Sequence, residues 1–162
     1  MRLADFVAKH PPKEPAKPPD NDDELRKLVE SDGVRWITDA PAKNPVGTGR
    51  PESSASVGCH LWVFDAGGIP HILERAPVSP PLQSGKAKHT NLTGGAPASC
   101  GGEMWFETEA STRIYVNGAS GRYGPTSAEQ LEDAIRVFSA LGYDVVSFGF
   151  DQDAGRAHRV LR

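Results

Sequence analysis

The sequence predicts an α+β domain built on a twisted, mostly antiparallel sheet of five or six strands. Three observations support this fold class. One long segment has apolar residues at helical spacing, and several short segments alternate in the manner of strands. Helices and strands do not alternate along the chain as they do in a doubly wound parallel fold. One main helix is therefore expected on a face of the sheet, together with a short N-terminal helix.

The N-terminal segment is expected to be a short helix followed by an extended spacer. Residues 2–9 have apolar side chains on one side of two helical turns. The prolines between positions 11 and 19 remove backbone donors and exclude a helix there. We therefore predict a flexible Pro-rich leader over residues 1–19 and a single domain over residues 20–162.

The middle of the chain is expected to supply most of the sheet. A helix is predicted over residues 20–33, because acidic residues begin this segment and a glycine ends it. A short strand is predicted at residues 34–39. Residues 59–76 alternate as a hairpin around the turn sequence Asp-Ala-Gly-Gly. Further short strands are predicted at residues 87–91, 103–107 and 113–116.

The clearest helical signal follows these strands. Ser127 and Gln130 stand three residues apart as a capping box, and apolar residues then share one face of a helix that ends at Gly142. Residues 143–151 are predicted to form the next strand. The basic tail, residues 152–162, is expected to add an edge strand.

Composition limits the class of function. The 162 residues carry a formal net charge of -3 at pH 7, which argues against a general electrostatic grip on nucleic acid. No apolar run is long enough to span a membrane, and the start of the chain lacks the apolar core of a secretory signal. Two cysteines without a CxxC spacing predict neither a disulfide framework nor a structural zinc site. We expect no metal, no cofactor and no membrane partner, and either a cytoplasmic location or secretion without a signal peptide.

The candidate site begins in residues 85–103, where glycines and polar side chains replace the apolar alternation of a core strand. Lys88 and His89 supply charge, and His89 can exchange a proton near neutral pH. Threonine hydroxyls and a glycine pair follow, and glycines allow backbone amides to approach an anion closely. The substrate-binding residues predicted in this stretch are Lys88, Thr90, Thr93, Gly94 and Gly95.

A second glycine-rich loop, residues 117–125, is expected to complete the site. Arg122 offers a forked donor for phosphate or carboxylate, and Tyr123 offers a hydroxyl and a flat ring. Each side chain also has a structural alternative: an arginine can pair with a carboxylate and a tyrosine can pack over a turn. The predicted catalytic residues are His89, Glu103, Arg122 and Tyr123, and Ser120 and Gly121 are predicted to bind substrate.

The two stretches together resemble a widespread small domain. It occurs at the ends of bacterial toxin-type proteins and in a segment of the plant calmodulin-binding IQ-motif proteins. Those relatives usually read His-Ser, a glycine pair, Ala-Gly-Glu or Ala-Gly-Arg, and Ser-Gly-His-Tyr-x-Pro. The resemblance covers residues 85–138, where Arg122 stands in place of the common histidine, and it implies a site more than a reaction. The matching positions are His89, Thr90, Leu92, Gly94, Gly95, Gly102, Ser120, Gly121, Tyr123 and Pro125.

Three functions stay open at this point. The first, which we rank highest, is a toxin-like bacterial effector that cleaves a phosphodiester bond of RNA without a metal and has an immunity protein as its partner. It would use His89 as general acid or base, with Lys88 and Arg122 stabilising the transition state.

The second is a transferase or hydrolase of a dinucleotide such as NAD. In it, His89 and Thr90 hold the ribose or the amide. Glu103 orients the ribose or a nucleophile, and Tyr123 stacks on the nicotinamide. The third is a non-catalytic module that binds a phosphate or carboxylate of a partner. All three require His89, Arg122 and Tyr123 to meet at one water-accessible cleft.

Overall fold

The structure, a computed structural model, describes residues 1–38, 43–52 and 57–161. Two short 3₁₀ turns, η1 (Asp22–Leu25) and η2 (Glu30–Asp32), precede the sheet. The helices are α1 (Leu3–Lys9), α2 (Thr90–Thr93) and α3 (Ala128–Ala140). The strands are β1 (Arg35–Ile37), β2 (His60–Val63), β3 (Ile69–Leu73), β4 (Gly101–Phe106), β5 (Arg113–Asn117), β6 (Asp144–Ser147), β7 (Phe150–Asp151) and β8 (Arg156–Ala157).

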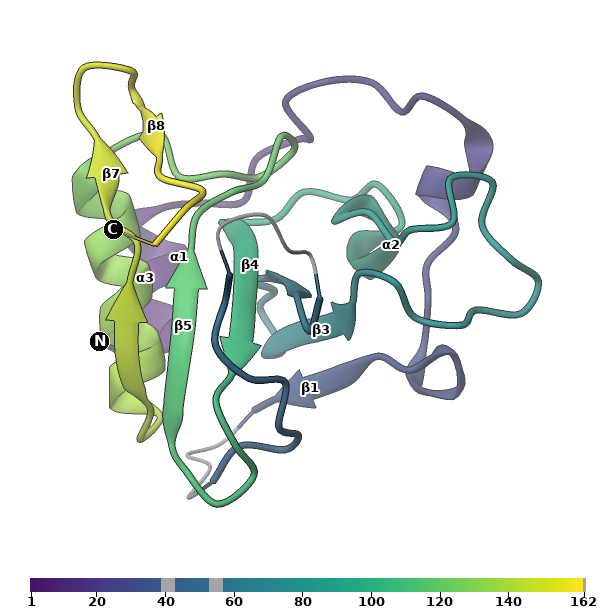
Figure 1. Cartoon of the computed structure of the whole chain (residues 1–162). Helices are drawn as coiled ribbons and strands as arrows, with labels where there is room; N and C mark the ends of the chain where they lie inside the picture. The colour runs from purple at the N-terminus through teal and green to yellow at the C-terminus, as the bar shows by residue number, and fades with distance from the viewer. Residues whose placement is uncertain (39–42, 53–56, 162) are drawn as a thin grey trace.

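Within these residues, one six-stranded sheet has the order β1-β3-β2-β4-β5-β6, and β7 and β8 form a separate pair (Figure 1). All neighbours in the large sheet are antiparallel except β5 and β6, which are parallel. The predicted α+β class is therefore confirmed, with one main helix and a short N-terminal helix. No helix of the described ranges is both long and apolar enough to cross a lipid bilayer.

Both faces of the central strands β2 and β4 are buried, because a different layer covers each one. Trp62 faces α3 and packs with Phe138 in a cluster that also contains Phe6 of α1. Leu61, the preceding residue, faces the opposite way and belongs to a cluster with Leu92 of α2. Figure 1 shows α1 and α3 together beside β5 and β6, while α2 stands apart from them. Successive side chains of β2 point to opposite faces of the sheet and so pack into two hydrophobic clusters rather than one.

The main helix begins and ends as its sequence predicts. The backbone N–H of Gln130 donates to Ser127 Oγ at 3.1 Å, which caps the first turn of α3. The side chain of Gln130 reaches back to the N–H of Thr126, at 2.9 Å, instead of closing the box on Ser127. Gly142 follows the helix with a φ of 96°, in the left-handed region that favours glycine.

Two elements predicted ahead of β4 differ in the structure. Residues 20–33 form the turns η1 and η2 rather than one helix, and residues 87–91 run into α2 rather than forming a strand. Asn91 explains both differences: its Oδ1 accepts from the N–H of Lys88 at 2.7 Å and so closes a turn. Its Nδ2 donates to the carbonyls of Asp23 and Arg26 and so holds the earlier segment in an irregular form.

The predicted final strands also divide differently. Residues 143–151 break into β6 and β7 at Gly149, whose φ is 80°. The tail pairs with β7 as β8 and does not extend the large sheet. Residue 39 of the first predicted strand and residue 162 of the tail lie outside the described residues.

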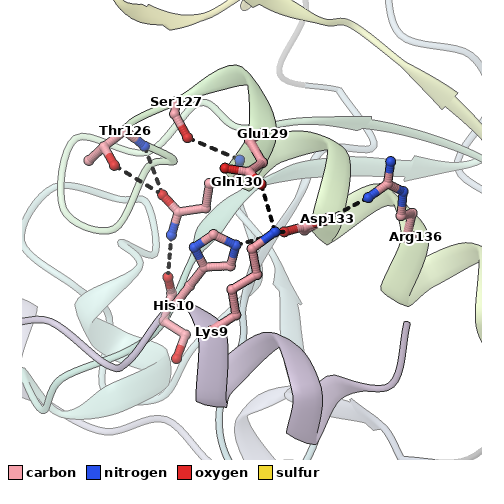
Figure 2. Close-up of polar contacts among 9 residues, drawn as sticks. Lys9, His10, Thr126, Ser127, Glu129, Gln130, Asp133 and Arg136 are labelled. Atoms are coloured by element: carbon pink, nitrogen blue, oxygen red, sulfur yellow. Dashed lines mark hydrogen bonds and ion pairs between the residues drawn. The ribbon is translucent and has the colours of Figure 1, made fainter.

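Residues 1–19, predicted as a flexible leader, lie against the body of the domain in the structure. Phe6 of α1 is fully buried. Figure 2 shows Lys9 and His10 converging on the buried carboxylate of Asp133 in α3, with Lys9 Nζ at 2.7 Å and His10 Nε2 at 2.8 Å from Oδ2. These contacts join the first helix to the main helix.

Candidate functional site

His89 lies in the wall of an open cavity of about 230 Å³, which we call the His89 cleft. The cleft forms where the start of α2, strand β4 and the loop after β5 meet. The sequence-predicted residues that line it are Lys88, His89, Glu103, Ser120, Gly121 and Arg122. The lining residues that the sequence did not connect to them are Lys17, Asp20, Leu61, Glu74, Ala87, Ala119 and Arg159.

His89 directly precedes α2, and its ring packs against β4. Its Nε2 lies 2.8 Å from the carbonyl oxygen of Gly102, which can only accept, so the neutral ring carries its proton on Nε2. Burial lowers the pKa of His89, although this hydrogen bond and the nearby Glu103 partly oppose that effect. The neutral ring therefore has Nδ1 available as an acceptor.

The glycine pair at the start of β4 is required by close packing. A Cβ on Gly101 would lie 3.4 Å from Cδ2 of His89 and 3.2 Å from Cβ of Tyr123. A Cβ on Gly102 would lie only 2.0 Å from the backbone oxygen of Asn117. Glycine at these positions lets the imidazole and the loop after β5 approach the strand.

Glu103 is held in one orientation by its neighbour across the sheet. Strand pairing places it opposite Asn117 of β5, whose Nδ2 donates to Glu103 Oε1 at 3.0 Å. The Cys59 thiol donates to Oε2 at 3.4 Å. Glu103 is half-buried and forms no ion pair with any described residue. The cleft thus contains a carboxylate that Asn117 holds in position and that no basic side chain of the described residues pairs with.

Arg122 lines the cleft, but its guanidinium is used by the fold. Its Nη2 donates to Glu24 Oε2 at 2.6 Å, and both side chains are almost fully buried. Its Nη1 donates to the carbonyls of Lys17 and Pro18 at 2.9 and 2.6 Å. Arg122 therefore has the structural role that the sequence left open, that of an arginine paired with a carboxylate. Its hydrogen bonds also tie the Pro-rich segment (residues 11–19) to the loop after β5.

Tyr123 does not line the His89 cleft. Its ring is fully buried, and its hydroxyl donates to the carbonyl of Ala96 at 2.8 Å. The same oxygen lies 2.9 Å from Thr93 Oγ1, so a predicted catalytic residue and a predicted substrate-binding residue face each other inside the domain. Burial raises the pKa of the Tyr123 hydroxyl, which keeps it protonated.

The other predicted threonine and the glycine pair lie behind the cleft. Gly94 and Gly95 have φ values of 68° and 84° and end α2. A Cβ on Gly95 would lie 2.7 Å from Cδ2 of Leu25, so this glycine also allows α2 to pack against η1. Thr90 is buried, and with Gly95 it lines a separate cavity beneath the Pro-rich segment. Of the three groups expected to meet, the structure brings together His89 and Arg122.

Three cations at the cleft form no ion pair within the part of the chain that the structure describes: Lys17, Lys88 and Arg159. Lys17 lies over Gly121, where an added Cβ would be 3.3 Å from Cε of the lysine. Lys17 and Arg159 have no local signal, because they lie far from the motifs in sequence. Asn117 did have a local signal, because it begins the second glycine-rich loop. The predicted strand ended at residue 116, one residue short of the pairing between Asn117 and Glu103.

No protein-family model matches this chain, and neither a curated protein nor a solved structure gives a match. The resemblance to the toxin-type and IQ-motif domain stays a prediction. Across the described ranges 1–38, 43–52 and 57–161, no group of three or more His, Cys, Asp or Glu side chains could hold a metal ion. The functional argument therefore depends on the geometry of the cleft.

Proposed function

We propose that this protein binds a nucleotide in the His89 cleft and acts on its ribose, as in hydrolysis of NAD or transfer of its ADP-ribosyl group. The proposal rests on one observation: an oriented carboxylate, Glu103, shares an open cleft with a buried neutral imidazole and with cations that have no ion-pair partner among the described residues.

Each group of the cleft suits one part of such a ligand. Lys17, Lys88 and Arg159 supply positive charge for the phosphate nearest the reacting ribose. Ribose hydroxyls donate hydrogen bonds, and both Glu103 and the free Nδ1 of His89 accept them. The cleft thus offers cations for the phosphate and acceptors for the sugar.

The reaction would take place at the ribose carbon C1′. The bond between C1′ and the nicotinamide nitrogen breaks, and its electron pair leaves with the nicotinamide, which becomes neutral. Positive charge then develops on the ribose, and the Glu103 carboxylate stabilises it because Asn117 already holds that carboxylate in place. Water or an acceptor hydroxyl adds to C1′ and releases one proton.

Two observations count against phosphodiester cleavage. That reaction needs a base for the attacking hydroxyl and an acid for the leaving one. His89 Nε2 is committed to a backbone carbonyl, and burial disfavours the protonated ring that would act as acid. Arg122, expected to stabilise the transition state, is already paired with Glu24. The groups of the cleft therefore suit a reaction at the ribose C1′ better than cleavage of a phosphodiester bond.

NAD consumption and nicotinamide release test the proposal. We expect the wild-type protein to consume NAD and the Glu103→Gln variant to do so on the order of 100-fold more slowly, as for loss of one preorganised electrostatic group. Glu132→Gln is the matched control, since Glu132 is exposed on α3 and does not line the cleft. Its rate should equal that of the wild type.

Two further assays, cleavage of total RNA and calorimetric binding of NAD, distinguish the alternatives. Total RNA that is cut while NAD is left intact would replace the proposal by the ribonuclease hypothesis. Calorimetric binding of NAD without turnover would favour the non-catalytic module. Equal rates for wild type and Glu103→Gln would remove Glu103 from the mechanism.

A further inference from the structure

A second cavity, which we call the Lys13 cleft, lies on the other side of the loop after β5. Its volume is about 290 Å³. It shares part of its wall with the His89 cleft, so the two cavities are adjacent. The shared residues are Ala119, Ser120, Gly121, Arg122 and Arg159.

The charge of the Lys13 cleft differs from that of its neighbour. Lys13, Arg156 and Arg159 line it together with Arg122, and no aspartate or glutamate does. In contrast, the His89 cleft also contains Asp20, Glu74 and Glu103. Of the cations in the Lys13 cleft, only Arg122 has a carboxylate partner among the described residues. The second cleft is therefore cationic throughout.

Lys13 is the most informative of these cations. It is half-buried, and its Nζ donates to the carbonyl of Gly124 at 2.7 Å. It forms no ion pair with any described residue. Burial lowers its pKa, as expected for a cation taken from water without an opposite charge. A partly desolvated and uncompensated charge costs free energy, and an anionic ligand would offset that cost.

The Pro-rich segment holds cations at both clefts. The backbone of Lys13 exchanges two hydrogen bonds with Ala98, each of 3.0 Å, and the carbonyls of Lys17 and Pro18 accept from Arg122. Lys13 then faces one cleft and Lys17 the other. The segment thus positions a cation on each side of the loop after β5. A ligand with two anionic groups could contact both cations by lying across this loop.

The volumes of the two clefts also favour a ligand that occupies both of them. Ligand pockets commonly have volumes of about 300–1,000 Å³. At about 230 and 290 Å³, each cleft is smaller than that range, so neither would hold a dinucleotide by itself.

We propose that the Lys13 cleft is a second phosphate subsite, and that the two clefts together bind a nucleotide with a diphosphate bridge. The reacting ribose and its phosphate occupy the His89 cleft, and Lys13 and Arg156 bind the second phosphate. Arg159, which lines both clefts, lies between the two phosphates. This inference rests on the proposed function, because the ribose in the His89 cleft defines the direction of the ligand.

Isothermal titration calorimetry with two related probes tests this subsite. ADP-ribose has both phosphates, whereas ribose 5-phosphate is its reacting end with one phosphate. We expect Arg156→Ala to weaken ADP-ribose binding about tenfold, the loss of one charge-assisted hydrogen bond, and to leave ribose 5-phosphate affinity within about twofold. Arg156 is exposed in β8, so its removal should not unfold the protein.

Arg35→Ala is the matched control, because Arg35 is an exposed arginine on β1, at one edge of the sheet, and lines neither cleft. Its affinity for both probes should equal that of the wild type at the same salt concentration. Failure of ADP-ribose to bind the wild-type protein would overturn the subsite. An ADP-ribose affinity that Arg156→Ala leaves unchanged would also overturn it, and so would an equal loss of affinity for both probes. If Arg156-dependent binding of ADP-ribose occurs without NAD consumption, the subsite stands and the proposed reaction fails.

Discussion

Replacing Arg122 separates its role in the fold from a role in chemistry. In Arg122→Gln, Glu24 would keep its burial, with a side chain that is only 3% exposed, but would lose its cation. The donors to the carbonyls of Lys17 and Pro18 would also be lost or weakened. Breaking a buried ion pair by removing one partner costs about 3–5 kcal/mol, so we expect a loss of that size in the free energy of unfolding.

Urea unfolding followed by circular dichroism measures this loss. A double-mutant cycle with Glu24→Gln should show coupling, because the second change removes the charge that the first leaves unpaired. The double variant should therefore lose less free energy than the sum of the two single variants.

The control is another arginine-carboxylate pair at similar distance but on the surface. Arg113 Nε lies 2.8 Å from Asp144 Oδ2, and these side chains are 48% and 56% exposed. Arg113→Gln should cost less than about 1 kcal/mol. A similarly small cost for Arg122→Gln would refute the structural role of Arg122 and return its guanidinium to the list of groups free to bind a ligand.

Two further predictions concern the core. His60 and His71 are buried with their Nδ1 atoms 2.9 Å apart, and burial lowers the pKa of His60 to about 4 and that of His71 well below its usual value. Because the unfolded state binds protons more readily below pH 6.5, stability should fall by about 2 kcal/mol from His60 alone between pH 7 and pH 5. His60→Gln should reduce that slope in urea unfolding, and an unchanged slope would contradict the burial argument. Separately, Gly102→Ala should cost about 3 kcal/mol or more, since its Cβ would lie 2.0 Å from the Asn117 oxygen. Gly67→Ala, where the nearest atom would be 3.4 Å away, should leave the melting temperature nearly unchanged.

Elements with a local signal could be predicted from the sequence alone. The cap at Ser127 and the apolar stripe that follows it define α3, and the alternation around the Asp-Ala-Gly-Gly turn defines the hairpin of β2 and β3. The period of a helix or a strand arises from residues that are neighbours in the chain. The segment at residues 20–33 has a helical pattern as well, but tertiary contacts with Asn91 replaced that helix by two turns.

The candidate site could be predicted only in part. The two glycine-rich stretches predicted that His89, Arg122 and Tyr123 would meet at one cleft, with Glu103 as a further catalytic residue. In the structure His89, Glu103 and Arg122 line the cleft, and Tyr123 does not. What each side chain does was decided by the tertiary structure. Arg122 pairs with Glu24, 98 residues earlier in the chain, and Tyr123 fills a core position.

The cations of the two clefts show the same limit. Lys13 and Lys17 come from the Pro-rich segment, and Arg156 and Arg159 come from the C-terminal tail. A sequence pattern records which residues share a face of one element, but not which distant segments pack together. The sequence therefore determined the glycine-rich scaffold of the site together with Lys88, Glu103 and Arg122. Only the packing of the Pro-rich segment and the C-terminal tail against that scaffold added Lys13, Lys17, Arg156 and Arg159 to the two clefts.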